Sequence, residues 1–212
     1  MKLIVIDSIL LLTGILPLFL IFLKKKTFNV KQPIIPFVWL TAVGALYELI
    51  GTVILKVNAT YWFQLYSLLG FCALYYFFFK LLNKKYKNAF VGFIIGFIAT
   101  YGTSFFFLDQ ENVFISTAIN EPFITIFVLV FSFLWFRQLF EKVNIPNLWK
   151  HPSFYFVSGL MIYYSGTFFF FLLSGSIFSS NCYFYDYWMV NIIAIVALRV
   201  FISVGIWRMK QD

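Results

Sequence analysis

Residues 123–136 read FITIFVLVFSFLWF and contain no charged side chain. Together with the apolar residues on either side, this run is about 20 residues long or more, the length an α-helix needs to cross about 30 Å of hydrocarbon. The segments of closed β-barrels are shorter and alternate in polarity, and this run does not alternate. The stretch therefore predicts a transmembrane helix.

The composition of the whole chain agrees with that prediction. The 212 residues are 62% hydrophobic and 11% charged, and the mean hydropathy is +0.90. A soluble domain carries roughly 25% charged residues, so too few charges are present to cover a water-facing surface. The 31 phenylalanines are interpreted as bulk that faces lipid. The composition predicts an integral membrane protein of the all-α class.

Seven apolar spans of sufficient length can be recognised, separated by short connections. Such a pattern predicts a seven-transmembrane-helix bundle that forms a single domain over residues 1–212. No connection is long enough to hold a soluble catalytic or nucleotide-binding domain. The predicted spans are Leu3–Leu23, Ile34–Leu55, Tyr61–Leu82, Ala89–Leu108, Val113–Leu139, Ser153–Phe178 and Tyr187–Trp207.

The basic residues predict the orientation of the bundle. Lys2 and Lys56 fall on one side and Arg199 falls inside a span, whereas thirteen of the 16 basic residues fall on the other side. The positive-inside rule places the richer side in the cytoplasm, which puts the N-terminus outside and the C-terminus inside. The net charge of +8 is thus explained by topology, without a nucleic-acid partner. The thirteen are Lys24, Lys25, Lys26, Lys31, Lys80, Lys84, Lys85, Lys87, Arg137, Lys142, Lys150, Arg208 and Lys210.

Ionisable and amide side chains inside the spans are the candidate site. Such groups are costly in hydrocarbon and face a protein interior or a wet cavity. At 1.5 Å per residue, most of them fall in the outer half of their helices, and Arg199 is roughly central. We expect Glu48, Asn120, Glu121 and Asn191 to line one cavity that opens to the outside; the alternative is a sealed, hydrogen-bonded plug. The full set of candidates is Asp7, Glu48, Gln64, Asn120, Glu121, Asn191 and Arg199.

Two features sharpen this expectation. Arg199 is interpreted as a buried counter-ion of Glu48 or Glu121; the alternative is that it extends towards the interface. One arginine against three acids leaves an acidic excess, so those acids are either protonated or hold a cation or an amine ligand. Pro122 lacks a backbone N–H, and a kink there would leave carbonyl groups unpaired beside Asn120 and Glu121.

Several chemistries are not predicted. The single histidine, His151, falls in a cytoplasmic connection, so neither haem ligation nor a metal site is indicated. Cys72 and Cys182 fall at different depths and do not predict a disulfide. No phosphate-binding glycine motif occurs. Ser165 beside Gly166 has no evident base. The chain is therefore predicted to be no enzyme and to need no cofactor.

The sequence also contains a weak internal repeat. Residues 44–52 and 159–167 both read G-x6-G-T, and the next spans begin with Tyr61-Trp62 and Tyr187-Trp188. Spans one to three and five to seven would run in the same direction, with span four as connector. That 3+1+3 plan resembles the SWEET and PQ-loop transporters, whose halves are parallel repeats, although no Pro-Gln pair occurs in the first or fifth span.

A second resemblance rests on Tyr47-Glu48, Asn120-Glu121 and the run Tyr-Ser-Gly-Thr-Phe at 164–168. With phenylalanine-rich helices throughout, these motifs resemble seven-helix integral membrane proteins of Bacteroidota that have no established activity. The resemblance implies the topology and a bacterial cytoplasmic (inner) membrane, and it implies no mechanism.

Two functional hypotheses follow from the sequence. The first is a binding module, acting as a sensor or as an accessory subunit of a larger membrane assembly, with a partner protein in the membrane or cytoplasm that supplies the output. The second is a small-solute transporter of SWEET-like plan, linked to protons through Glu48 or Glu121. The sequence identifies no ligand, partner or oligomeric state.

Overall fold

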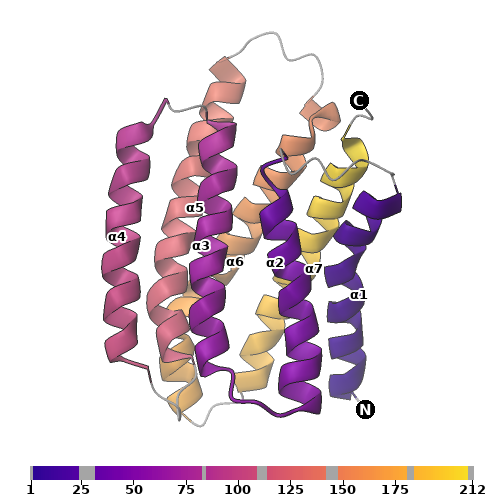
Figure 1. Cartoon of the computed structure of the whole chain (residues 1–212), viewed down its shortest axis with the longest axis vertical. Helices are drawn as coiled ribbons and strands as arrows, with labels where there is room; N and C mark the ends of the chain where they lie inside the picture. Colours follow the sequence, from indigo (N-terminus) through magenta and orange to yellow (C-terminus); the bar gives the residue numbers. More distant parts are fainter. Residues whose placement is uncertain are drawn as a thin grey trace.

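Seven long helices make up the computed structural model (Figure 1), which describes residues 2–23, 32–82, 85–108, 114–141, 148–180 and 184–209. No strand occurs within these ranges. The helices are α1 (Lys2–Leu23), α2 (Ile35–Tyr47) continued by a π-helix η1 (Glu48–Ile54), α3 (Thr60–Leu81), α4 (Lys87–Phe106), α5 (Ile115–Glu141), α6 (Pro152–Ser179) and α7 (Phe184–Arg208), with a short 3-10 turn η2 (Leu148–Lys150) before α6.

The predicted spans are confirmed as helices. Six of the helical segments are long and apolar enough to cross a membrane, and the described apolar part of α1, Ser8–Leu23, is shorter. The chain is thus a multi-pass helical membrane protein. The start of α1 and the end of α7 lie at opposite ends of the bundle (Figure 1), as an odd number of crossings requires.

Six of the helices form a closed ring. Along the ring, α1 packs on α2, α2 on α3, α3 on α5, α5 on α6, α6 on α7, and α7 returns to α1. The fourth helix, α4, lies outside the ring against α5 and α3, and Figure 1 shows it at the edge of the bundle. Side chains that point inward from the six ring helices therefore share one interior.

Aromatic rings attach α4 to the ring helices. Phe97 of α4 stacks on Phe71 of α3 with ring centroids 3.8 Å apart, and Phe90 of α4 stacks on Phe131 of α5 at 4.0 Å. Phe127 of α5 contacts both Phe71 and Phe90. The prediction that the phenylalanines face lipid is therefore wrong for this set, which is buried and forms the core between α3, α4 and α5.

The second span contains a helical irregularity that the sequence did not predict. The α-helix α5 runs as one element from Ile115 to Glu141 with Pro122 inside it. By contrast, the second span changes to π-helix at Glu48, and the amide of Leu55 donates to the carbonyl of Ile50 at 2.9 Å. Such π-segments are rare and often occur at functional sites. The irregular backbone thus begins at one of the candidate carboxylates.

Glycines allow the closest helix approaches in the ring. A Cβ on Gly159 of α6 would lie 2.6 Å from Cβ of Phe201 of α7, and a Cβ on Gly205 of α7 would overlap the ring of Phe156 of α6. A Cβ on Gly14 of α1 would lie 2.6 Å from Cβ of Ala45 of α2 and 3.3 Å from Cζ of Arg199. Small residues let neighbouring backbones approach closely in membrane bundles, and these contacts position α7 against α6 and α1.

Candidate functional site

Glu121 of α5 is a buried carboxylate in the ring. Its side chain is 9% exposed, and Oε1 accepts a hydrogen bond of 2.9 Å from the hydroxyl of Ser67 on α3. The backbone carbonyl of Glu121 accepts a further bond of 2.9 Å from the hydroxyl of Thr125. The α5 helix thus presents an acid to α3, and the described partner of that acid is a neutral hydroxyl.

Tyrosines on two ring helices lie within electrostatic range of this acid. Tyr66 of α3 and both Tyr163 and Tyr164 of α6 interact electrostatically with Glu121. The rings of Tyr163 and Tyr164 meet edge to face with centroids 4.9 Å apart. Tyr164 is buried, whereas Tyr66 and Tyr163 are half-buried.

Glu48 and Arg199 belong to the same group of charges. Tyr66 and Tyr163 each interact electrostatically with both of these residues as well as with Glu121. Arg199 interacts with Glu48 in turn. We refer to these six residues, which come from five helical segments, as the central cluster: Glu48, Tyr66, Glu121, Tyr163, Tyr164 and Arg199.

Arg199 is 2% exposed and turns towards the first helix. Its Nη1 donates to the carbonyl of Leu10 at 2.6 Å and to the hydroxyl of Thr13 at 3.3 Å. Among the residues that the structure describes, the ion pair within 4.0 Å joins Arg137 and Glu141. Glu121 is therefore not a direct partner of Arg199, and the interaction of Arg199 with Glu48 is electrostatic. The alternative prediction, that Arg199 extends towards the interface, does not agree with its burial.

The amide side chains predicted for the site, Gln64, Asn120 and Asn191, belong to two separate hydrogen-bonded groups. Asn191 of α7 accepts a hydrogen bond of 3.2 Å from the hydroxyl of Tyr163, so it adjoins the central cluster. Asn120 instead donates from Nδ2 to Gln64 of α3 and to Ser104 of α4, both at 3.1 Å, and Gln64 donates to Ser104 at 2.7 Å. This second group ties α4 to the ring, and Asn120 is fully buried in it.

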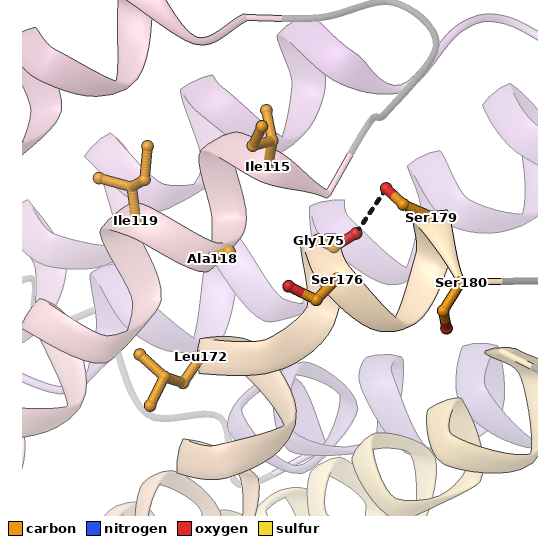
Figure 2. Close-up of a pocket in the computed structure, with 8 residues that line it drawn as sticks. All are labelled: Ile115, Ala118, Ile119, Leu172, Gly175, Ser176, Ser179 and Ser180. Carbon is orange, nitrogen blue, oxygen red and sulfur yellow. Dashed lines mark hydrogen bonds between the residues drawn. The ribbon is translucent and has the colours of Figure 1, made fainter. Parts of the chain in front are cut away.

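An open groove lies elsewhere, between the start of α5 and the end of α6 (Figure 2). Its volume is about 660 Å³, and its walls are largely apolar or small. The groove contains none of the candidate site residues predicted from the sequence. It is lined by Ile115, Ala118, Ile119, Leu172, Gly175, Ser176, Ser179 and Ser180.

The predicted site is thus brought together only in part. Glu48, Glu121 and Arg199 all lie within electrostatic range of Tyr66, and Asn191 bonds Tyr163, whereas Gln64 and Asn120 form the separate group with Ser104. The side chain of Asp7 and the whole of Cys182 lie outside the described residues, and Cys72 is an exposed, free thiol. The opening of the site to the outside stays a prediction.

Sequence reasoning missed the tyrosines and the serines. The chain is rich in aromatic residues and has 13 tyrosines. The sequence therefore did not distinguish Tyr66, Tyr163 and Tyr164 from the other ten. Ser67 and Ser104 resemble ordinary small residues of membrane helices. For Ser67, the spacing was a usable signal. It lies three residues after Gln64, so the two side chains share one helical face, and Ser67 could have been predicted to lie near other polar groups.

Comparisons with family models, with curated proteins and with solved structures found no match for this chain. The resemblances to SWEET-like and Bacteroidota proteins therefore stay predictions. The functional argument rests on the side chains of the ring interior.

Proposed function

We propose that the protein is a non-enzymatic binding module of a bacterial inner membrane, with the N-terminus outside and the C-terminus in the cytoplasm. The observation that carries this proposal is the burial of an acid, Glu121, and an arginine, Arg199, in the helices of one ring, with tyrosines of α3 and α6 within electrostatic range of them. Polar groups at such depth are expensive and usually serve a function. A small polar ligand that reaches the cluster would contact several helices together.

The output of such a module would come from a partner. The longest connection between long helices covers residues 24–34, so no enzymatic domain is inserted between them. A ligand held by α3, α5 and α6 would change how these helices pack, and a neighbouring membrane or cytoplasmic protein would respond to that change. The proposal thus includes a sensor or an accessory subunit of a larger assembly.

Cysteine accessibility tests whether the central cluster can be reached. In a chain with Cys72 and Cys182 replaced by alanine, Ser67→Cys and Asn191→Cys should react with a small membrane-impermeant thiosulfonate added to intact cells. Ser67 contacts Glu121, and Asn191 contacts Tyr163, so both thiols would report on the same interior. Mass spectrometry of the purified protein would measure the modified fraction.

Two positions serve as controls in that experiment. Ser180→Cys at the exposed end of α6 should react quickly if that end faces outward, and Ser132→Cys, which replaces a fully buried serine of α5, should not react. If Ser180→Cys reacts while both Ser67→Cys and Asn191→Cys stay unmodified, the cluster is sealed, and a purely structural subunit becomes the better account.

A second function, a proton-linked small-solute transporter of 3+1+3 plan, is favoured by the π-helix that begins at Glu48. Irregular backbone in a membrane helix is tolerated where it lines a protein-buried or wet site. The two functions differ in whether the solute crosses the membrane. Purified protein in liposomes with an imposed proton gradient would accumulate a bound solute if it were a transporter, and it would bind without accumulation if it were a binding module.

A further inference from the structure

The hydrogen-bond partner of the Glu121 side chain is neutral. The acid is buried in α5, a helix that is long and apolar enough to cross a membrane. Its Oε1 accepts a hydrogen bond of 2.9 Å from the hydroxyl of Ser67, which carries no charge. An acid in a span is either protonated or held by a cation, and the charges on the surrounding helices distinguish these two states.

The basic residues of the neighbouring helices lie far along the bundle from Glu121. The helices that pack on α5 are α3, α4 and α6. The α6 helix contains no charged residue, Lys80 lies in the last turn of α3, and Lys87 is the first residue of α4. Lys80 follows Ser67 by 13 residues, which is about 20 Å along the helix axis. Arg137 of α5 itself follows Glu121 by 16 residues, or about 24 Å.

Two further basic residues do not balance the charge of Glu121 either. Arg199 is on α7, which packs on α6 and α1, and its Nη1 donates to the carbonyl of Leu10 on α1 at 2.6 Å. Lys56 is exposed in the connection before α3. No residue that the structure describes forms an ion pair with Glu121, and Glu48 is itself an acid.

The other titratable groups on the helices around Glu121 are phenols. Tyr66 of α3 and both Tyr163 and Tyr164 of α6 lie within electrostatic range of the acid, and α4 contributes Tyr101. A phenol ordinarily loses its proton near pH 10, and burial disfavours the charged form further. These groups are therefore uncharged at neutral pH.

A buried carboxylate without a nearby cation becomes neutral by binding a proton. We propose that Glu121 is a carboxylic acid at neutral pH, so that the ring holds a titratable proton where α3 and α5 meet. Oε1 is then the carbonyl oxygen that accepts the bond from Ser67, and the other oxygen carries the proton. This inference goes beyond the proposed binding function and does not require the interior to be open. In the transporter alternative, this proton is the one linked to solute movement.

Infrared spectroscopy tests this proposal directly, because the C=O stretch of a protonated carboxyl group absorbs apart from the stretches of a carboxylate. Spectra of the full chain, purified in detergent at neutral pH, would be compared with those of Glu121→Gln. We expect a protonated-carboxyl band in the unmodified chain that Glu121→Gln loses. The matched control, Glu141→Gln, changes an exposed acid at the end of the same helix and should keep the band.

A second variant, Ser67→Ala, keeps the acid and removes the hydroxyl that bonds Oε1. A hydrogen bond to a carbonyl oxygen lowers the frequency of its stretch, so the band should move to higher frequency in Ser67→Ala. Its control is Ser132→Ala, which changes a buried serine of α5 whose hydroxyl has no described partner, and the band should stay in place. The serine pair provides the test should Glu121→Gln fail to fold.

Two results would overturn the inference: no protonated-carboxyl band at neutral pH, or a band that is unchanged in both Glu121→Gln and Ser67→Ala. The inference and the proposed function can fail separately. A band that depends on Glu121 in a chain whose interior is sealed to the thiol reagent supports the inference and contradicts the binding function. Modified thiols without the band support the binding function and show that Glu121 is ionised.

Discussion

Arg199→Leu is expected to lower the free energy of unfolding by about 1.5–3 kcal/mol, the usual contribution of a hydrogen bond to a charged group. The guanidinium bonds the carbonyl of Leu10 and balances the charge of Glu48. Leucine supplies neither interaction, so the α1–α7 contact should weaken and the acid should lose its balancing charge. Thermal unfolding of the purified protein in detergent, followed by its loss of monodispersity, measures the effect.

Arg208→Leu is the matched control for this experiment, because Arg208 is exposed at the end of the same helix. Its unfolding temperature should stay close to that of the unmodified chain. The double variant Arg199→Leu with Glu48→Gln separates the two causes. If the double variant is more stable than Arg199→Leu alone, the unbalanced charge of Glu48 is the main cause of the lost stability. If it is no more stable, the lost hydrogen bonds to α1 are the main cause. Equal stability of Arg199→Leu and Arg208→Leu would contradict the structural role of Arg199.

Gly159→Leu should also destabilise the protein strongly, through the contact between α6 and α7. Even a bare Cβ at this position would lie 2.6 Å from Cβ of Phe201, an atom that cannot move without its backbone. Overpacking in a well-packed interior typically costs about 1–3 kcal/mol, and it can cost more when backbones must separate. We expect a low yield of folded protein and a lower unfolding temperature.

Gly166→Leu offers a close comparison, because Gly166 lies on the same helix two turns further on with open space around its Cβ position. This variant should change the stability by no more than about 0.5 kcal/mol, as is usual for exposed substitutions. Similar losses for Gly159→Leu and Gly166→Leu would show that helix propensity or insertion, and not the α6–α7 contact, determines the outcome.

The helices themselves were predictable because bilayer thickness fixes the length of an apolar span. The predicted span Ser153–Phe178 compares with α6 at Pro152–Ser179, and Ile34–Leu55 compares with α2 and η1 over residues 35–54. The burial of polar groups was predictable for the same reason, since hydrocarbon excludes them. Asn120, Glu121 and Arg199 are all buried as expected.

The hydrogen-bond partners of those groups were not predictable. Hydropathy indicates how deep a residue lies in the membrane, but it does not indicate which neighbouring helix its side chain faces. Asn120 and Glu121 are neighbours in sequence, yet helical geometry turns one towards Ser104 on α4 and the other towards Ser67 on α3. Glu48 lies where a π-helix begins, which changes the angular position of every later residue in that span. The packing of α3 on α5, which leaves α4 outside, depends on aromatic stacking that no local pattern specifies.

The closure of the ring by α1 and α7 sets an order for biogenesis. The hydrogen bond between Leu10 and Arg199 joins residues 189 positions apart, so the first helix must wait in the membrane until the last has left the ribosome. During that interval the face of α1 near Gly14 has no α7 to cover it, and α3 likewise waits for α5. The ring can therefore close only after the seventh helix has inserted, and a ribosome stalled before that helix would leave the bundle unclosed.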